Sequence, residues 1–567
     1  MPEYISVGST RKRQFHGVVR SNSLGNELLG KLGFLRFLAG SNAVSVLCQI
    51  VSVDRRNNVH EDGSFGPVIA ARGSIPYLSN IGDYEEAVAK PIAQQVNGSP
   101  APLRANPPSG SQIVSLDDAS IVPDGSESVT PQRVFNSFSP VEEQYLRYSG
   151  HLIGENICLP FICKSFHPND ENGWQEARHA SFFGRQGSGK THAAKSMLAM
   201  YLLSTPAMGA FIPDGKGDFV RPSRVDLDLQ GLLQANGRSV EVITLEDIRL
   251  EETTQFDQLL HIENFKSLVL SSAAGDKWRQ LLEFTLAQFT DDDGRLIVEG
   301  EGAITLRGFL DAINRTIPLV YSGSQRDLDR RVEQAETMQA NNGRRITAAF
   351  ERVASRFRQG IPINTVVDSV LSQGHIYFLD VQEFDREVNI YILGTLYRRF
   401  RSRASHLYYR RTYSNAIVYV DEANRFIPQN PADDRKELAR ELIDSIRTTR
   451  QYGLAWWFAD QRPASISKDA FTQMGTYFFG KGMNAVADRD SMKSVLGEDG
   501  CNIYDYVVTT GGRPFVVTGQ FVGIGSSDYV PVPIEFFRNW QELADNNNLD
   551  FATRIRPPAT SPALARP

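Results

Sequence analysis

Short apolar runs alternate with longer amphipathic stretches through most of the chain after residue 150. The runs are rich in Val, Ile, Phe and Trp and have the length of buried strands. They are ASFF (180–183), GAFIPD (209–214), GHIYFLDV (374–381), AIVYVDE (416–422) and LAWWFAD (454–460). The stretches between them show the 3.6-residue period of helices. This alternation predicts an α/β fold with a mostly parallel sheet and helices on both faces.

One interval between two of these strands is too long for a simple crossover. From about residue 250 to 370 the chain contains a series of amphipathic segments, each with helical periodicity. They are DKWRQLLEFTLAQF (276–289), TLRGFLDAIN (305–314), RDLDRRVEQAETMQ (326–339) and RRITAAFERVASRF (344–357). The pattern predicts a helical insertion into the α/β domain.

The first 95 residues have the pattern of β-strands. AVSVLCQIVSV (43–53) is rich in β-branched residues, and FHGVVR (15–20) and GPVIAARG (66–73) are shorter candidate strands. GNELLGKLGFL (25–35) places glycines at close intervals between apolar residues, as tight barrel corners do. These features predict a small β-barrel.

Composition suggests where the domains begin and end. The stretch near residues 97–135 begins rich in Pro, Gly and Ser, which predicts a loop or linker. We therefore expect the barrel over residues 1–150, the α/β domain over 151–540 and a tail over 541–567.

Charge and cysteine usage exclude some classes of protein. The chain has 567 residues, 41% of them apolar, and a formal net charge of −6. This charge argues against a protein that coats nucleic acid along its whole surface, but it says nothing about a locally basic channel. Four cysteines lack metal-ligand spacing, so we expect free buried thiols in a reducing compartment.

The membrane is not indicated by the sequence. The opening MPEYISVGSTRKRQF has no apolar core of a signal peptide. Residues 196–213 are uncharged and reach the lower limit for a spanning helix, but STPAMG within them signals a turn. We expect a soluble, cytoplasmic protein.

The segment FGRQGSGKT (183–191) carries the clearest chemistry. It matches the phosphate-binding pattern G-x-x-x-x-G-K-[ST], between a predicted strand and a predicted helix. Its eight residues are Gly184, Arg185, Gln186, Gly187, Ser188, Gly189, Lys190 and Thr191. The lysine would reach the β- and γ-phosphates and the threonine hydroxyl would bind Mg²⁺. An accidental glycine-rich turn is the alternative, and the flanking strand and helix argue against it.

Further polar residues follow later strands of the same domain. Asp421 and Glu422 end the strand AIVYVDE, where one carboxylate can hold Mg²⁺ and its neighbour can polarise water. Gln461 ends LAWWFAD and is placed to sense a γ-phosphate. Arg447 and Arg450 lie on one face near the end of a predicted helix (436–453), where a solvated C-terminal turn is an equally good reading.

Together these motifs resemble the HerA family of hexameric ATPases, within the HerA/FtsK group of DNA-pumping motors. The opening GVVRSNSLGNELLGKLGFL also looks like the start of the barrel domain of that family. The motifs that carry the resemblance are RHASFFGRQGSGKT (178–191), DGKGDF (214–219), VYVDEANRF (418–426) and RTTRQYGLAWWFADQRPASIS (447–467). The resemblance implies a RecA-like ATPase domain with ATP and Mg²⁺ as ligands.

The resemblance also implies a role for each site residue. Lys190 and Thr191 would bind phosphate and Mg²⁺, with Asp421 as a second metal ligand. Glu422 would be the catalytic carboxylate and Gln461 the sensor. Arg450 or Arg447 would reach a neighbouring subunit's nucleotide, and Arg178 would also touch a nucleotide at the interface. Asp214 and Lys216 would either line the same cleft or form a strand-end turn. Asn424 stands where the family commonly has histidine.

The partners implied by the family are other copies of the chain, DNA and an effector. The family implies a homohexameric ring that threads double-stranded DNA and works with a nuclease or, in anti-phage defence, another effector subunit. We expect that subunit to dock on the barrel, whose apolar run is dense enough to leave some residues exposed. The run consists of Leu32, Phe34, Leu35, Phe37 and Leu38.

Two matters stay open at this point. The arginine-rich stretch 397–411 suggests nucleic-acid binding or, more simply, a solvated or interface helix, and residues 342–345 and 480–482 are candidate pore loops. Two rivals to a DNA motor also remain. One is a coupling ATPase of conjugation or secretion, which usually has membrane helices, and the other is an ATP-binding ring scaffold that activates an effector enzyme.

Overall fold

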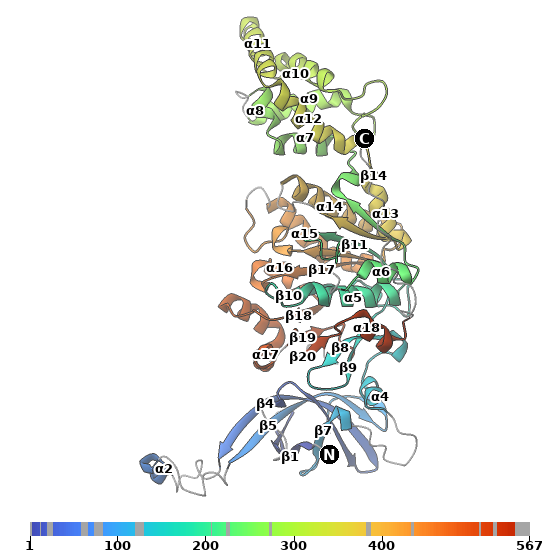
Figure 1. Ribbon diagram of the computed structural model, residues 1–567, viewed down its shortest axis with the longest axis vertical. Coiled ribbons are helices and arrows are strands. Elements are labelled where there is room, and N and C mark those ends of the chain that lie inside the picture. Colours follow the sequence, from blue (N-terminus) through green and yellow to red (C-terminus); the bar gives the residue numbers. More distant parts are fainter. Residues whose placement is uncertain are drawn as a thin grey trace. The chain divides into compact units, whose positions relative to one another are not determined.

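The computed structural model divides the chain into two compact units, which Figure 1 shows as ribbons. Unit 1 comprises residues 1–210, 222–239 and 407–567, and unit 2 comprises residues 211–221 and 240–406. The structure describes residues 3–11, 13–19, 27–57, 66–72, 83–118, 130–205, 207–222, 227–270, 275–321, 323–381, 387–432, 436–509, 512–525 and 530–549.

The N-terminal part of unit 1 is a closed antiparallel β-barrel, as the sequence predicted. Its strands follow the order β2-β1-β7-β3-β4-β5, and pairing of β5 with β2 closes it. They are β1 (Glu3–Arg11), β2 (Gln14–Val19), β3 (Leu32–Ala39), β4 (Asn42–Asn57), β5 (Asp83–Val96) and β7 (Gln112–Ser115), with the short β6 (Ser99–Ala101) beside β5. Closure means that each of the six described wall strands has a pairing partner on both sides.

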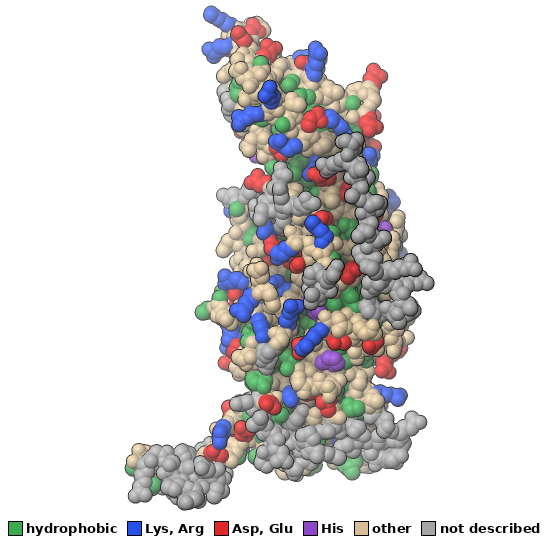
Figure 2. Space-filling view, in the orientation of Figure 1, with side chains coloured by type: hydrophobic (Ala, Val, Ile, Leu, Met, Phe, Trp, Pro, Cys, Tyr) green, Lys and Arg blue, Asp and Glu red, His purple; other side chains and the backbone are tan. Residues whose placement is uncertain are grey.

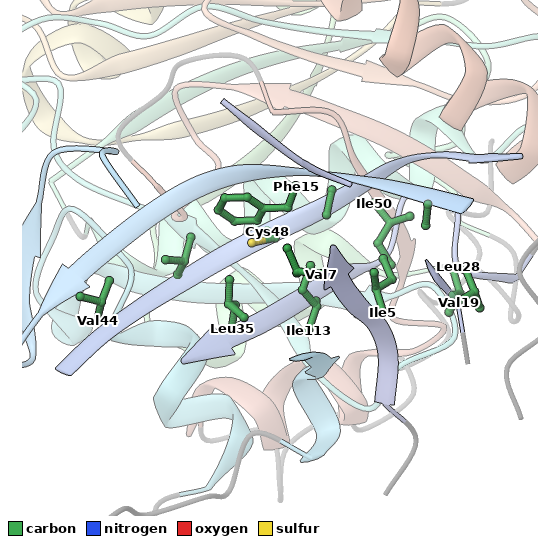
Figure 3. Close-up of a cluster of buried hydrophobic side chains, with 13 residues drawn as sticks. Ile5, Val7, Phe15, Val19, Leu28, Leu35, Val44, Cys48, Ile50 and Ile113 are labelled. Atoms are coloured by element: carbon green, nitrogen blue, oxygen red, sulfur yellow. The ribbon is translucent and has the colours of Figure 1, made fainter. Parts of the chain in front are cut away.

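The interior of the barrel is filled by apolar side chains from every strand of its wall. Phe15, Leu35, Cys48 and Ile113 are fully buried and gather between the strands (Figure 3). In the apolar run of β3, Leu32, Phe34 and Leu35 are buried, Phe37 packs against the core, and Leu38 is 70% exposed. The run therefore divides between core and surface, as predicted.

Two predictions for the barrel region are wrong. Residues 66–72 form a helix, α2 (Gly66–Arg72), because Pro67 suits a first helical turn and alanines favour the helix. The stretch expected to be a loop contains β6, β7 and, after residue 130, the helix α4 (Pro131–Asn136). β7 pairs with β1 and β3 on its two sides, so tertiary pairing outweighs the local composition.

The α/β part of unit 1 contains a mixed sheet. The strand order is β16-β17-β10-β18-β19-β20-β8-β9, parallel from β16 to β18 and antiparallel from there to β9. The bounds are β8 (Leu146–Leu152), β9 (Cys158–Ile162), β10 (Ala180–Phe183), β16 (Ala416–Asp421), β17 (Leu454–Asp460), β18 (Thr476–Phe479), β19 (Pro514–Gly519) and β20 (Val532–Phe536). The predicted α/β class is confirmed, while the antiparallel half was not foreseen.

Helices cover this sheet. α5 (Lys190–Ser204) packs on β8, β10, β17 and β20, and its side chains from Ala193 to Leu202 are buried. The other helices of the α/β part are α6 (Leu229–Ala235), α15 (Lys436–Thr449), α16 (Lys468–Phe471), α17 (Val486–Thr509) and α18 (Trp540–Asn547). The chain turns after α5, so the uncharged run over 196–213 is a helix, a turn and a strand, as predicted.

The expected domain limits need two corrections. The limit between residues 150 and 151 falls inside β8, which pairs with β20 and β9 as an interior strand. The expected tail begins with part of α18, where Leu543 is fully buried and Asn547 exchanges hydrogen bonds of 2.7 and 2.8 Å with the backbone of Tyr148. The rest of the expected tail, from residue 550, lies outside the described residues.

The barrel is joined to the α/β part of unit 1 by buried contacts. Gln49 of β4 is 1% exposed, and its side-chain amide donates to the carbonyl oxygens of Gly30 (3.3 Å) and Pro531. A Cβ atom added at Gly30 would lie 2.8 Å from a methyl group of Ile503 in α17. The barrel is therefore packed against α17 and the segment before β20.

Unit 2 contains a three-strand sheet and most of the helices predicted for the insertion. The sheet order is β12-β15-β11, with β12 (Val240–Thr244), β15 (Ile376–Asp380) and β11 (Gly209–Asp214). The helices are α7 (Thr253–Ile262), α8 (Phe265–Val269), α9 (Gly275–Leu286), α10 (Leu306–Val320), α11 (Gln325–Asn341), α12 (Gly343–Arg358), α13 (Ile363–Gln373) and α14 (Glu387–Tyr409). Phe256, Phe309 and Phe350 pack edge to face or tilted in the helical core.

On the face shown in Figure 2, Lys and Arg side chains lie among Asp and Glu side chains. Within the described parts of the chain, no helix has the length and apolar character that crossing a bilayer requires.

Candidate nucleotide site

The glycine-rich segment forms a tight loop between β10 and α5. Gly184 has φ +157°, and a Cβ atom there would lie 2.3 Å from the hydroxyl oxygen of Ser188. Gly189 has φ +96° and precedes the first residue of α5. Both positions favour glycine, because other side chains would strain the backbone or clash. The loop therefore leads directly into the amino end of α5, and the amino end of a helix suits an anion.

Two polar side chains of the loop, those of Lys190 and Ser188, are turned toward the loop itself. The Lys190 ammonium donates to the carbonyl oxygens of Gly184 and Arg185, the second at 3.4 Å. Ser188 is 3% exposed, and its hydroxyl has no hydrogen-bond partner among the residues that the structure describes. Arg185, Gln186 and Gly187 are exposed at the tip of the loop. A cation over a bowl of backbone amides fits a phosphate chain.

The segment after β18 supports the loop from one side. The backbone N–H of Gly480 donates to Phe183 (2.8 Å), and that of Arg185 donates to the carbonyl of Lys481 (2.8 Å). Residues 480–482, considered above as a pore loop, thus lie against the phosphate loop.

The acidic residues predicted from the sequence end a nearby strand at the same sheet edge. β17 lies between β10 and β16, with Phe183 opposite Asp460 and Asp421 opposite Ala459. The carboxyl ends of the three strands therefore meet, which is where α/β sheets bind ligands. Asp421 lies two strand spacings from β10, roughly 10 Å. Gln461 follows β17 and is exposed at this edge.

Glu422 has an unusual backbone. It adopts the left-handed conformation, with φ +49°, and its N–H donates to Asp421 Oδ1 at 3.0 Å. A non-glycine residue in this region stores strain, which is common at functional sites. Its carboxylate accepts a hydrogen bond from Arg425 Nε. The strained turn aims the side chain of Glu422 differently from that of Asp421.

Asp460 is a buried carboxylate that the sequence analysis did not single out. It is 4% exposed and accepts hydrogen bonds from the backbone N–H of Asn424 (2.8 Å) and the hydroxyl of Ser465 (2.8 Å). Burial raises its pKa, and these hydrogen bonds oppose the rise. Asp460 thereby ties the turn after Glu422 to the end of β17. Its place at the end of a strand, directly before Gln461, was the available signal.

Two of the predicted arginines lie at the opposite edge of the sheet. Arg178 precedes β10, and Arg450 lies just before β17 begins. The Glu176 carboxylate pairs with both, at 2.8 Å to each guanidinium. The chain from Arg178 to Gly184 runs along β10 for roughly 20 Å. Neither arginine therefore lies at the sheet edge that carries the phosphate loop of the same chain.

The third predicted arginine is in the last turn of α15. Arg447 is 46% exposed, and its guanidinium lies 3.1 Å from the carboxylate of Asp469 in α16. The structure thus groups Arg178 with Arg450 and leaves Arg447 on a helix surface.

A buried histidine fixes the amino ends of the strands that carry these arginines. His179 accepts a hydrogen bond from the backbone N–H of Trp456 at Nδ1 (3.0 Å), and its Nε2 lies 2.8 Å from the carbonyl of Ile446. Burial lowers the pKa of His179 to about 4, so the ring is neutral near pH 7. It joins β10, β17 and α15.

The carboxylate of Asp214 forms hydrogen bonds within the turn that follows it. Asp214 is 2% exposed, and its carboxylate accepts hydrogen bonds from successive backbone N–H groups that follow it, at 2.8–3.2 Å. The donors are Lys216, Gly217, Asp218, Phe219 and Val220. Of the two readings given to DGKGDF, this geometry favours the strand-end turn.

Most of the arginine-rich stretch belongs to α14. Two of its aromatic side chains pack in the interior, and two of its arginines form ion pairs. Tyr397 and Phe400 are fully buried, Arg399 pairs with Glu252, and Arg403 pairs with Asp368. These contacts favour a packed helix over a nucleic-acid surface. By contrast, Arg344 and Arg345 are exposed at the start of α12, and a DNA contact there stays a prediction.

The residues at the loop suit a nucleotide with a divalent metal. Mg²⁺ prefers oxygen ligands, and the hydroxyl of Thr191 and the carboxylate of Asp421 are of that kind. Among the described residues no cluster of three or more His, Cys, Asp or Glu is arranged for a metal. A metal at this site would therefore depend on phosphate oxygens for further ligands, as Mg²⁺ commonly does.

No protein-family model and no curated protein sequence matches the chain. Among solved structures, VirB4 of Thermoanaerobacter pseudethanolicus matches at 13% identity over 70% of this chain and 97% of that chain, with a TM-score of 0.39. The plasmid coupling protein TrwB in complex with the GTP analogue GDPNP matches at 13% identity over 71% and 92%, with a TM-score of 0.37.

A third solved structure is the genome packaging NTPase B204 from Sulfolobus turreted icosahedral virus 2 in complex with AMPPCP. It matches at 8% identity over 60% of this chain and 92% of that chain, with a TM-score of 0.26. All three TM-scores lie below 0.5, so the function proposed below rests on the residues of this chain.

Proposed function

We propose that this protein is an ATPase that assembles as a homohexameric ring and uses ATP hydrolysis to move along double-stranded DNA, as a HerA-like translocase or helicase. The observation that carries the proposal is the meeting, at one sheet edge, of the phosphate loop with Asp421, Glu422 and Gln461.

Each residue at this edge has a role in hydrolysis. The loop amides and Lys190 bind the phosphates, and Thr191 and Asp421 hold Mg²⁺, which neutralises charge on the phosphate oxygens. Glu422 orients and polarises the attacking water, and Gln461 contacts the γ-phosphate. For Glu422 to act as a base, its carboxylate must turn from Arg425 toward the water.

The arginines at the opposite edge support the ring. Arg450 and Arg178 do not share an edge with the phosphate loop of their own chain, so they serve a nucleotide only if it belongs to another subunit. An arginine supplied in this way stabilises transition-state charge and can raise the rate by about 10³–10⁵. Arg447 remains the alternative for this role.

Adding duplex DNA tests whether ATP hydrolysis is coupled to DNA. We expect duplex DNA to raise the rate of ATP hydrolysis by the full-length protein several-fold, because a DNA-translocating ATPase hydrolyses ATP faster when it is bound to DNA. Glu422→Gln is the control, and it should lower the rate of ATP hydrolysis by about 10²–10⁴ both with and without DNA. An effector subunit docked on the barrel remains part of the proposal.

Two results would contradict the DNA motor. One is ATP hydrolysis that duplex DNA leaves unchanged over a range of salt concentrations. The other is ATP-dependent ring assembly without turnover, which would favour the scaffold.

A further inference from the structure

An arginine outside all the motifs discussed so far lies against the phosphate loop. Arg513 directly precedes β19, and only β18 separates β19 from β10. β18 and β19 are antiparallel, with Phe479 opposite Val516. The beginning of β19 therefore lies at the sheet edge where β10 ends and the phosphate loop begins.

The contact between Arg513 and the loop is close. A Cβ atom added at Gly189 would lie 3.2 Å from Arg513 Cδ, 3.4 Å from Arg513 Cβ and 3.6 Å from a ring carbon of Phe515. Phe515 is 1% exposed and packs edge to face against Phe536. Residues two apart in an extended segment point to the same face. The buried Phe515 thus fixes the direction of Arg513, beside the amino end of α5.

Among the described residues, no carboxylate forms an ion pair with this guanidinium, and Arg513 is exposed. Glu535 on the neighbouring strand β20 is close by, but it pairs with Arg538 at 3.3 Å. The first turn of α5 has no acidic residue. A cation beside the positive end of a helix is unfavourable by itself and suits an anion placed between them.

The position of Arg513 in the strand order indicates which part of a bound nucleotide it would contact. Asp421, Glu422 and Gln461 follow β16 and β17, on one side of β10, so the γ-phosphate must point to that side for hydrolysis. Arg513 comes from β19, on the other side of β10. It therefore faces the end of the phosphate chain that is attached to the nucleoside.

We propose that Arg513 binds the α-phosphate of the nucleotide held by its own chain. This inference rests on the proposed ATP site and adds to it a residue that serves ATP and ADP alike. Such a residue sets the affinity for both nucleotides and leaves the chemical step unchanged. It differs in this from Lys190 and Glu422, which act at the β- and γ-phosphates.

The test measures binding of ADP and of ATP by titration calorimetry, with Glu422→Gln as the background so that ATP stays intact. Arg513→Ala should raise the Kd for both nucleotides by about tenfold, which corresponds to about 1.4 kcal/mol. In the chain with native Glu422, Arg513→Ala should raise KM for ATP by a similar factor and leave kcat within about twofold. Arg513→Lys should lie between the two, since it keeps the charge and loses the planar fork.

Arg538→Ala is the matched control, because Arg538 is an exposed arginine nearby that already pairs with Glu535. It should leave both Kd values unchanged. Equal Kd values for Arg513→Ala and the unchanged chain would overturn the inference, as would a fall in kcat with unchanged ADP affinity. Failure of the background chain itself to bind ADP or ATP would instead overturn the proposed ATP site.

Discussion

Lys190 and Glu422 separate binding from chemistry at the level of single residues. Lys190 supplies positive charge to the loop, whereas Glu422 lies on a strained turn directly after Asp421, the proposed metal ligand. We expect Lys190→Ala to weaken ATP binding. Glu422→Gln should bind ATP with near-native affinity and lower kcat by about 10²–10⁴, the usual contribution of a general base.

Nucleotide titration and steady-state hydrolysis together check these two variants. Glu437→Gln is a suitable control, because Glu437 is an exposed carboxylate at the start of α15. Hydrolysis by Glu422→Gln at near the native rate would show that another group activates the water.

The residues of the site differed in how far they could be predicted. The phosphate loop is contiguous in the chain, so its spacing alone identifies it. Asp460 and Arg513 lie at the site because of the order of the strands in the sheet, and the local sequence around each residue does not reveal that order. Arg425 is three residues from Glu422, and the turn between them brings the two side chains together.

At the level of elements, arginines lie at the amino ends of β10 and β17, away from the phosphate loop of the same chain. A mixture of two inactive chains tests whether these arginines act between subunits. One chain carries Lys190→Ala and the other carries Arg447→Ala with Arg450→Ala. Mixing should restore some ATP hydrolysis, because a native loop then meets native arginines at some interfaces.

Arg440→Ala is the control for this mixture, since Arg440 is exposed on the same helix, α15, and should leave activity unchanged. Mixing without recovery, although mass measurements show that subunits exchange, would contradict action between subunits. Full activity of a strictly monomeric chain would do the same.

Elements with strong local patterns were predicted best. The strands β11, β15, β16 and β17 and the helices α9 to α12 have clear periods and were foreseen. β7, β19 and β20 were missed, and residues 66–72, which contain Val and Ile, were predicted as a strand but form the helix α2. Such segments are determined by pairing partners far away in the chain.

At the level of the whole molecule, the barrel is held to the α/β part of unit 1 by the buried Gln49 and by the packing of Gly30 against Ile503. It carries none of the residues assigned to ATP hydrolysis. Leu38, near the end of β3, is 70% exposed and is available for the docking of an effector, which remains a prediction.

Movement along duplex DNA powered by ATP is the core of the proposed function, and displacement of a third strand from a DNA triplex reports it directly. The full-length protein should release the third strand when ATP is present, and neither ADP nor the Glu422→Gln variant with ATP should support release. ATP hydrolysis at full rate on the same DNA, with the third strand left in place, would contradict a translocating motor.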